Sequence, residues 1–107
     1  KALNGVEDDA FMEVAKNMAH YHHEKWNGKG YPEGLAGRRI PLEARIMALA
    51  DVFDALVSKR CYKEKYSYDE AFQIIEESLG SHFDPELGQA FLRCRKGLED
   101  YYDTVED

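Results

Sequence analysis

The sequence predicts an all-α domain with four helices. Apolar residues recur at helical spacing in four segments, and Asp, Ser and Pro stand where such segments begin. No segment alternates apolar and polar residues as a half-buried strand would. The chain has 107 residues, which suffice for one hydrophobic core and are too few for two domains. We therefore expect a single helical domain.

The first helix is predicted over residues 8–23, which contain no Gly or Pro. At about 100° per residue, its apolar side chains form one stripe, and this stripe consists of Phe11, Val14, Ala15, Met18 and Ala19. His22 continues the stripe and His23 lies at its edge, so we expect both imidazoles to point inward. His20 falls on the opposite, polar face.

The paired histidines are candidate metal ligands. Burying two imidazoles is unfavourable unless each is hydrogen-bonded or ligated, because an unsatisfied buried polar group costs about 1–3 kcal/mol. For either residue alone, a hydrogen-bonded structural imidazole is the simpler interpretation. As a pair beside Glu24, His22 and His23 favour a metal site, since imidazole nitrogen is a common ligand of first-row metals.

A long loop is predicted over residues 24–41, because four glycines, Gly28, Gly30, Gly34 and Gly37, exclude a helix there. Loops of this length are usually functional or disordered. Trp26 and Tyr31 indicate an ordered loop, and their rings either anchor it or stack on a nucleobase.

The second helix is predicted over residues 41–57, with Pro41 in its first turn and a dense apolar stripe of Leu42, Ile46, Leu49, Ala50, Phe53, Leu56 and Val57. On its other face, Asp51 accompanies Ala44, Ala48 and Ala55. These small residues would let another helix approach, and Asp51 between two helices would need a cation. Asp51 is therefore a third candidate ligand. A solvated carboxylate is the alternative.

The second half of the chain supplies phosphate candidates and two further helices. Arg60 and Lys63 follow the Asp51 helix and are suited to phosphate, although solvated connector charges are the alternative. Ser67, with Glu70 three residues later, predicts a capping box for a helix that ends near Gly80. Asp84 and Pro85 predict the start of the last helix. The acidic tail from Glu99 is expected to fray.

Charge and composition narrow the function. The net charge is −7, yet residues 24–65 carry nine basic and six acidic groups, which suits a small anionic ligand better than a nucleic acid polymer. No apolar run approaches the roughly 20 residues of a membrane-spanning helix. Without an apolar signal-peptide core, the expected location is the cytoplasm. Cys61 and Cys94 are isolated and are expected to be reduced.

The segment HHEKWNGKGYPEGLAGRRIPLEARIMALADVFDALVSKRCYK, residues 22–63, closely resembles the carboxy-terminal half of the HD-GYP domain, a bacterial metal-dependent phosphohydrolase of the HD superfamily. GSHFDPELGQAF, residues 80–91, is similar to the stretch that usually follows. The resemblance implies a partial HD-domain-like helical bundle with a Gly-rich GYP loop between its first two helices. It identifies residues 1–107 as the carboxy-terminal part of one such domain.

The resemblance also implies an activity, the hydrolysis of cyclic di-GMP to pGpG or GMP. In the family a di- or trinuclear iron or manganese centre polarises the phosphodiester and activates a bridging water. The matching positions imply that His22, His23 and Asp51 are metal ligands and that Arg60, Lys63, Gly30, Tyr31 and Pro32 bind substrate. The GYP loop is associated in the family with contacts to GGDEF-type synthase domains.

This chain departs from the family pattern in two respects. The family's HD pair, its lysine and its further His ligands lie upstream of the paired His, and this chain starts too late to contain them. The fragment alone is therefore expected to be inactive, and its uncovered helix faces make a homodimer a further hypothesis. The second departure is Asn27, where the family usually has Asp.

Two functions compete with the phosphodiesterase. One is a degenerate cyclic-dinucleotide receptor or a GYP-loop docking module for GGDEF-type domains. The other is a structural role in which His22 and His23 bind one zinc ion. The sequence leaves open the identity of the metal and the choice between cyclic di-GMP and a mixed cyclic dinucleotide.

Overall fold

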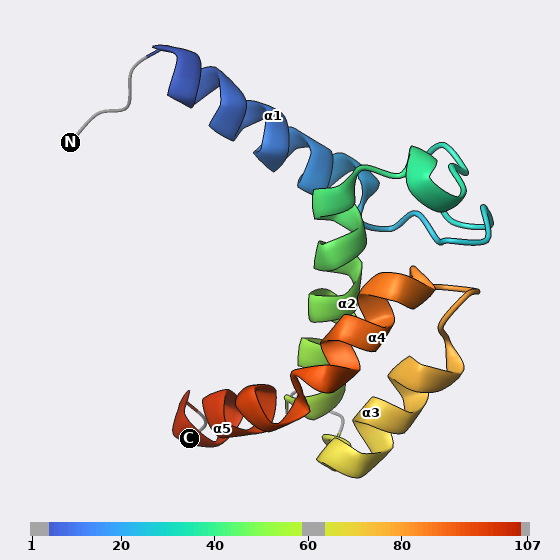
Figure 1. Ribbon diagram of the computed structural model, residues 1–107, viewed down its shortest axis with the longest axis vertical. Helices are drawn as coiled ribbons and strands as arrows, with labels where there is room; N and C mark the ends of the chain where they lie inside the picture. The colour runs from blue at the N-terminus through green and yellow to red at the C-terminus, as the bar shows by residue number, and fades with distance from the viewer. Residues whose placement is uncertain (1–4, 59–63, 106–107) are drawn as a thin grey trace.

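The computed structural model describes residues 5–58 and 64–105 and contains only helices as regular elements in these ranges (Figure 1). The elements are α1 (Gly5–Tyr21), a 3-10 turn η1 (Gly37–Arg39), α2 (Leu42–Val57), α3 (Tyr68–Glu77), α4 (Pro85–Arg93) and α5 (Arg95–Val105). The all-α prediction is confirmed. None of the described helices is both long and apolar enough to cross a membrane.

Two predicted helix starts are confirmed in atomic detail. The Ser67 hydroxyl accepts a hydrogen bond from the Glu70 amide at 3.1 Å, and the Glu70 carboxylate accepts one from the Ser67 amide at 3.0 Å. This is the reciprocal capping box. The Asp84 carboxylate accepts hydrogen bonds from the amides of Glu86 and Leu87, and Pro85 is the first residue of α4.

The carboxy-terminal tail corrects the sequence prediction. It was expected to fray beyond four helices, but it forms a fifth helix, α5. Leu98 and Tyr102 pack against the core, and the Tyr102 hydroxyl donates a hydrogen bond to Asp54 of α2 at 2.8 Å. The Tyr68 hydroxyl makes a similar bond to Asp103. These tertiary contacts stabilise a segment whose acidic composition alone does not predict a helix.

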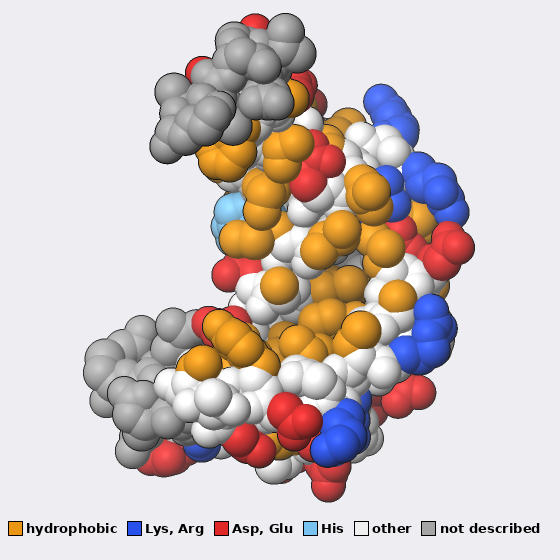
Figure 2. All heavy atoms as spheres, turned by 60° about the vertical axis from the view of Figure 1, so that its left-hand side comes forward, with side chains coloured by type: hydrophobic (Ala, Val, Ile, Leu, Met, Phe, Trp, Pro, Cys, Tyr) orange, Lys and Arg blue, Asp and Glu red, His pale blue; other side chains and the backbone are white. Residues whose placement is uncertain are grey.

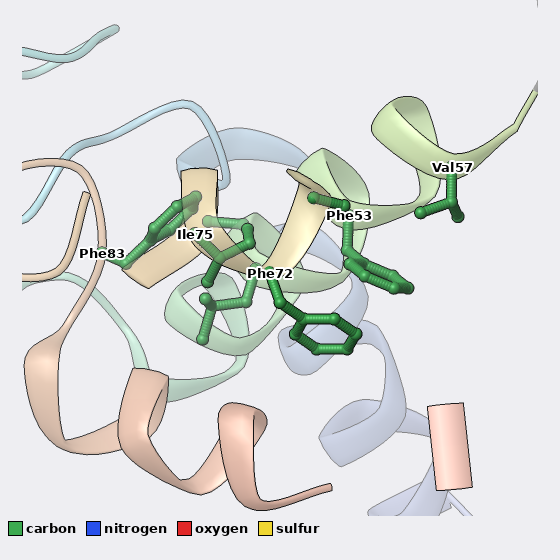
Figure 3. Packing of buried hydrophobic residues seen from close by; sticks show 8 residues of the cluster. Phe53, Val57, Phe72, Ile75 and Phe83 are labelled. Carbon is green, nitrogen blue, oxygen red and sulfur yellow. The ribbon is translucent and has the colours of Figure 1, made fainter. Parts of the chain in front are cut away.

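The hydrophobic core lies where α2, α3 and α4 meet (Figure 3). Phe53 is 1% exposed, and its ring centroid lies 4.8 Å from that of Phe72 and 5.4 Å from that of Phe91. Ile75 and Phe83 are also fully buried. The carboxy-terminal half of α2 therefore packs in the core, while its amino-terminal half contacts α1.

The last turns of α1 contact α2, whereas the amino-terminal end of α1 extends away from it (Figure 1). The Asn17 side-chain amide donates a hydrogen bond to Glu43, in the first turn of α2, at 2.7 Å. The apolar stripe of α1 was expected to be buried, but Phe11 is 65% and Val14 43% exposed. This expectation is wrong because no described element covers that half of α1.

The exposed stripe continues into an apolar hollow on one side of the molecule (Figure 2). Leu42 and Ile46 of α2 are half exposed, although they belong to the predicted core stripe. Ile46 also borders an apolar groove of about 260 Å³ between α2 and α4, lined further by Leu49, Ala50, Leu87, Ala90, Phe91 and Cys94. We call Phe11, Val14, Leu42 and Ile46 together the apolar face.

Candidate metal site and glycine loop

His22 follows the last turn of α1 and is oriented by the helix backbone. Its Nδ1 lies 2.8 Å from the carbonyl oxygen of Met18. A carbonyl oxygen only accepts hydrogen bonds, so Nδ1 carries the proton and Nε2 of the neutral ring keeps its lone pair. Metal-binding histidines are typically oriented in this way by a hydrogen bond from the other ring nitrogen. The half-buried His22 is therefore suited to bind a metal through Nε2.

His23 lies beside His22, with 4.0 Å between the two ring centroids. Its other neighbour is Tyr31, whose ring is nearly parallel to the imidazole at a centroid distance of 5.0 Å and an angle of 16°. The inward orientation predicted for both residues holds only in part, since His22 is half-buried and His23 is exposed. His20 points outward as predicted, and its Nε2 lies 3.0 Å from the Glu33 carboxylate.

Asp51 does not lie between two helices, as the sequence suggested, but is exposed. The reason is that α1 meets α2 at Glu43, about two helical turns before Asp51. Among the described side chains of residues 8–58 and 64–105, no three of His, Cys, Asp or Glu are grouped so that they could hold a metal ion. The two imidazoles and one carboxylate fit a first-row metal by donor type. They supply only part of a ligand set.

Glu24 stabilises the loop of residues 24–41, which we call the glycine loop, through two hydrogen bonds to its main chain. Its side chain is buried, at 2% exposure for the residue, and one carboxylate oxygen accepts a hydrogen bond from the Glu33 amide at 2.7 Å. The other oxygen accepts one from the Leu35 amide at 2.8 Å. We call this pair of bonds the Glu24 clamp. The sequence did not predict this clamp, since its only local signal is an acidic residue ahead of a glycine-rich stretch.

The Gly30-Tyr31-Pro32 segment folds back onto the chain at His23. The Tyr31 amide donates a hydrogen bond to the His23 carbonyl at 3.3 Å. A Cβ atom added to Gly30 would lie 2.4 Å from the same carbonyl oxygen and 2.5 Å from the Lys25 nitrogen, so only glycine fits. Tyr31 remains 61% exposed, and Pro32 is also exposed.

Asn27, the second departure from the family pattern, makes a local turn within the loop. Its side-chain oxygen accepts a hydrogen bond from the Lys29 amide at 2.9 Å. An aspartate carboxylate would accept the same bond. The Asn at this position therefore leaves the turn intact.

The loop also docks on the turn between α3 and α4. The Trp26 amide donates to the His82 carbonyl at 3.0 Å, and the Asn27 amide donates to the Ser81 carbonyl at 2.9 Å. His82 is half-buried and its ring is stacked on Phe83. Burial lowers the pKa of His82, and the positive charge of Lys25 acts in the same direction. The fold thus joins the α3–α4 turn at His82 to Trp26, three residues after His23.

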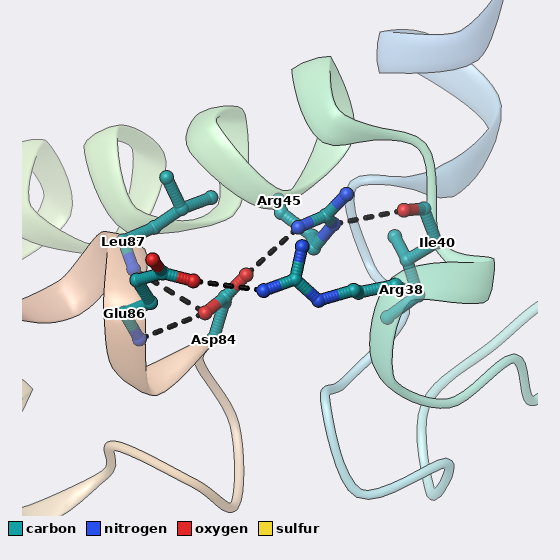
Figure 4. Close-up of polar contacts among 6 residues, drawn as sticks. All are labelled: Arg38, Ile40, Arg45, Asp84, Glu86 and Leu87. Atoms are coloured by element: carbon teal, nitrogen blue, oxygen red, sulfur yellow. Dashed lines mark hydrogen bonds and ion pairs between the residues drawn. The ribbon is translucent and has the colours of Figure 1, made fainter.

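A buried ion pair holds the end of the loop against α4 (Figure 4). The Arg45 guanidinium donates to Asp84 at 2.8 Å and to the carbonyl of Ile40 at 2.9 Å. The side chains of Arg45 and Asp84 are 12% and 2% exposed. Nearby, Arg38 pairs with Glu86 at 2.8 Å, but both side chains are largely in solvent. The Arg45 pair therefore joins the loop, α2 and α4.

The two phosphate candidates, Arg60 and Lys63, lie outside the residues that the structure describes. Their predicted role stays a prediction.

Comparison with known proteins gives a consistent result. Residues 1–87 match the family model described as the HD domain. The chain is 59% identical over 83 residues to a probable cyclic di-GMP phosphodiesterase from Vibrio cholerae, covering 78% of this chain and 19% of that protein. It is 55% identical, over 78% of its length and 17% of the relative's, to a cyclic di-GMP phosphodiesterase from the same organism.

A solved structure supports the fold. The crystal structure of a cyclic GMP-AMP specific phosphodiesterase from Vibrio cholerae matches 82% of this chain and 21% of its own, with a TM-score of 0.60 and 33% sequence identity. The chain thus spans about a fifth of the length of each of these relatives.

Proposed function

Because the chain belongs to the HD-domain family, we propose that it is part of a metal-dependent phosphodiesterase that hydrolyses cyclic di-GMP to pGpG or GMP. The observation that carries this proposal is the histidine pair at the end of α1. His22 donates through Nδ1 to Met18 and keeps its Nε2 lone pair for a metal, and His23 lies directly beside it. The 59% identity to a probable cyclic di-GMP phosphodiesterase supports the same reaction class.

In this proposal His22, His23 and Asp51 bind metal in a di- or trinuclear iron or manganese centre. When bound, such metals supply Lewis-acid polarisation of the phosphodiester and an activated water. Three donors are too few for such a centre, so other parts of the protein supply the remaining ligands. His22 is oriented by its bond to Met18, whereas the exposed Asp51 is not grouped with the two histidines among the described residues.

Substrate binding is assigned to two basic residues and to the Gly30-Tyr31-Pro32 segment. Arg60 and Lys63 bind the phosphates, and Tyr31, with Gly30 and Pro32, presents an exposed aromatic ring next to His23. Lys25 adds a positive charge two residues after His23. The ligand is a cyclic dinucleotide, either cyclic di-GMP or the mixed cyclic GMP-AMP. A cytoplasmic location is part of the same proposal.

The test is turnover of cyclic di-GMP by the intact protein, reduced and loaded with iron or manganese. We expect His22→Ala to reduce turnover by more than the roughly 10–100-fold loss typical of substitutions around a metal site. His20→Ala is the matched control, since His20 lies on the opposite face, where it pairs with the exposed Glu33 and its ring packs edge-on against Tyr21. No turnover by a protein with confirmed bound metal would contradict the proposal.

The second candidate is a cyclic-dinucleotide receptor or a docking module for GGDEF-type synthase domains. The exposure of Tyr31 and Pro32 at the loop surface favours it, because exposed aromatic side chains are typical of binding surfaces. Calorimetry that detects cyclic di-GMP binding without hydrolysis would select this function. A single tightly bound zinc ion in elemental analysis would instead select a structural role for His22 and His23.

A further inference from the structure

We propose that Tyr31 is a positioning residue for His23 and that the Glu24 clamp holds Tyr31 in place. This inference rests on the proposed function, in which His23 binds a metal. In this inference the Tyr31 ring orients His23 in addition to binding substrate. Glu24, a buried residue that the proposed reaction does not use, holds the loop that carries Tyr31.

His22 and His23 are oriented in different ways. His22 has the hydrogen bond from Nδ1 to the Met18 carbonyl. Among the described residues, the His23 ring has no hydrogen-bond partner, and its ring contacts are with His22 and Tyr31. A metal ligand needs a fixed ring orientation, and hydrogen bonds usually supply it. For His23, the nearly parallel ring of Tyr31 fixes the orientation of the imidazole.

The main chain at Tyr31 is held next to His23. The Tyr31 amide donates to the carbonyl of His23, so the two stacked residues are also joined through their main chains. Gly30 packs so closely on residues 23–25 that no side chain fits. The main chain that carries the ring therefore stays beside His23 unless the loop as a whole moves.

The Glu24 clamp keeps the loop from moving. Its carboxylate joins residue 24 to residues 33 and 35, and the Tyr31 segment lies between these points. Bonds from backbone amides to an ionised carboxylate are stronger than those between neutral groups, and burial excludes water that would compete for them. Because Glu24 follows His23 directly, the clamp and the metal ligand share one stretch of backbone.

The test uses imidazole NMR of the intact, metal-free protein labelled at histidine nitrogen, with His23→Gln identifying the His23 signals. Tyr31→Leu removes the ring and should shift the His23 ring signals, and it should weaken Mn²⁺ binding by about 10-fold or more. Tyr31→Phe keeps the ring and should give the His23 signals and the Mn²⁺ affinity of the wild type. Glu24→Gln replaces one acceptor oxygen by an amide group. Like Tyr31→Leu, it should shift the His23 ring signals and weaken Mn²⁺ binding. Glu33→Gln is the control, because the side chain of Glu33 is exposed and only its amide takes part in the clamp.

The outcomes separate this inference from the proposed function. Unchanged His23 signals in Tyr31→Leu would overturn the positioning role, even in a protein that hydrolyses cyclic di-GMP normally. Tyr31 is 61% exposed, so this variant keeps its fold and decides the question even where Glu24→Gln unfolds the loop. A wild-type protein that binds no Mn²⁺ or iron would overturn both proposals.

Discussion

Among the glycines of the loop, Gly30 is the one at which an added Cβ would meet the closest contacts. We predict that Gly30→Ala lowers the free energy of unfolding by about 1–3 kcal/mol, as overpacking does in a close-packed site. The cause is the added Cβ, which would lie 2.4 Å from the His23 carbonyl and 2.5 Å from the Lys25 nitrogen. Urea unfolding followed by circular dichroism measures the change.

Gly97 in α5 provides the control for this substitution. Nothing lies within 4 Å of a Cβ added there, so Gly97→Ala should raise stability by roughly 0.5–1 kcal/mol through its higher helix propensity. Equal effects of the two alanines would show that the close contact at Gly30 does not constrain the loop.

Asp84 should make stability depend on pH in the acid range. Burial acts to raise its pKa, but the hydrogen bonds from Arg45 and from the amides of Leu87 and Glu86 outweigh burial and lower it. A carboxyl group with a lowered pKa in the folded state contributes stability above its unfolded pKa of about 3.9. This contribution is lost as the pH falls through the lower folded-state pKa.

We therefore predict a steeper loss of stability below about pH 4 in the wild type than in Asp84→Asn. Thermal unfolding between neutral pH and pH 3 measures it. Parallel curves for the two proteins would contradict the assignment of this acid sensitivity to Asp84.

The sequence predicted single residues well where a helical pattern orients them and poorly where the backbone supplies the partner. His22 was identified because it continues the stripe of α1, and it is half-buried with an ordered imidazole. Glu24 was not identified as a clamp, because its partners are main-chain amides nine and eleven residues away. Such partners exist at nearly every residue and leave no pattern of side chains in the sequence.

At the level of elements, the Arg45–Asp84 pair joins α2 to α4 and to the end of the loop. We predict that Arg45→Gln costs about 3–5 kcal/mol of stability, because it leaves the 2% exposed Asp84 carboxylate without its cation. Arg38→Gln should cost at most about 1 kcal/mol, since the Arg38–Glu86 pair is exposed. Guanidinium chloride unfolding of both variants gives the comparison, and a similar cost for both would contradict it.

Helix boundaries were predicted where local chemistry determines them. The capping box at Ser67 and the Asp84-Pro85 start are confirmed because caps are contacts between near neighbours in the chain. Helix α5 was missed because its support comes from Asp54 of α2 and from the core, both distant in sequence. An acidic segment with Leu98 and Tyr102 one helical turn apart was the only local signal.

For the whole molecule, the apolar face should make the isolated 107-residue chain associate. Phe11, Val14, Leu42 and Ile46 are all more than 40% exposed, and contiguous exposed apolar residues favour contact with another protein surface. We predict concentration-dependent sedimentation for this chain and a shift toward the monomer in Ile46→Lys. Glu76→Lys, at an exposed position of α3 outside this face, is the control. A monomer at all concentrations would contradict the prediction.

The arrangement of elements in space was the least predictable level. A helical wheel assigns residues to faces, and it correctly placed Leu49, Phe53 and Val57 of α2 in the core. It does not say which neighbour covers a face, so it gave the stripe of α1 a burial that the described chain does not provide. Asp51 was misplaced for the same reason, because α1 crosses α2 before reaching it.

The contact between the glycine loop and the α3–α4 turn consists of two main-chain hydrogen bonds, from Trp26 to His82 and from Asn27 to Ser81. Every residue except proline offers a backbone amide, and every residue offers a carbonyl. Replacing the side chains at these four positions therefore removes neither bond. This contact can persist while the sequences on both sides diverge, provided that proline does not arise at positions 26 or 27.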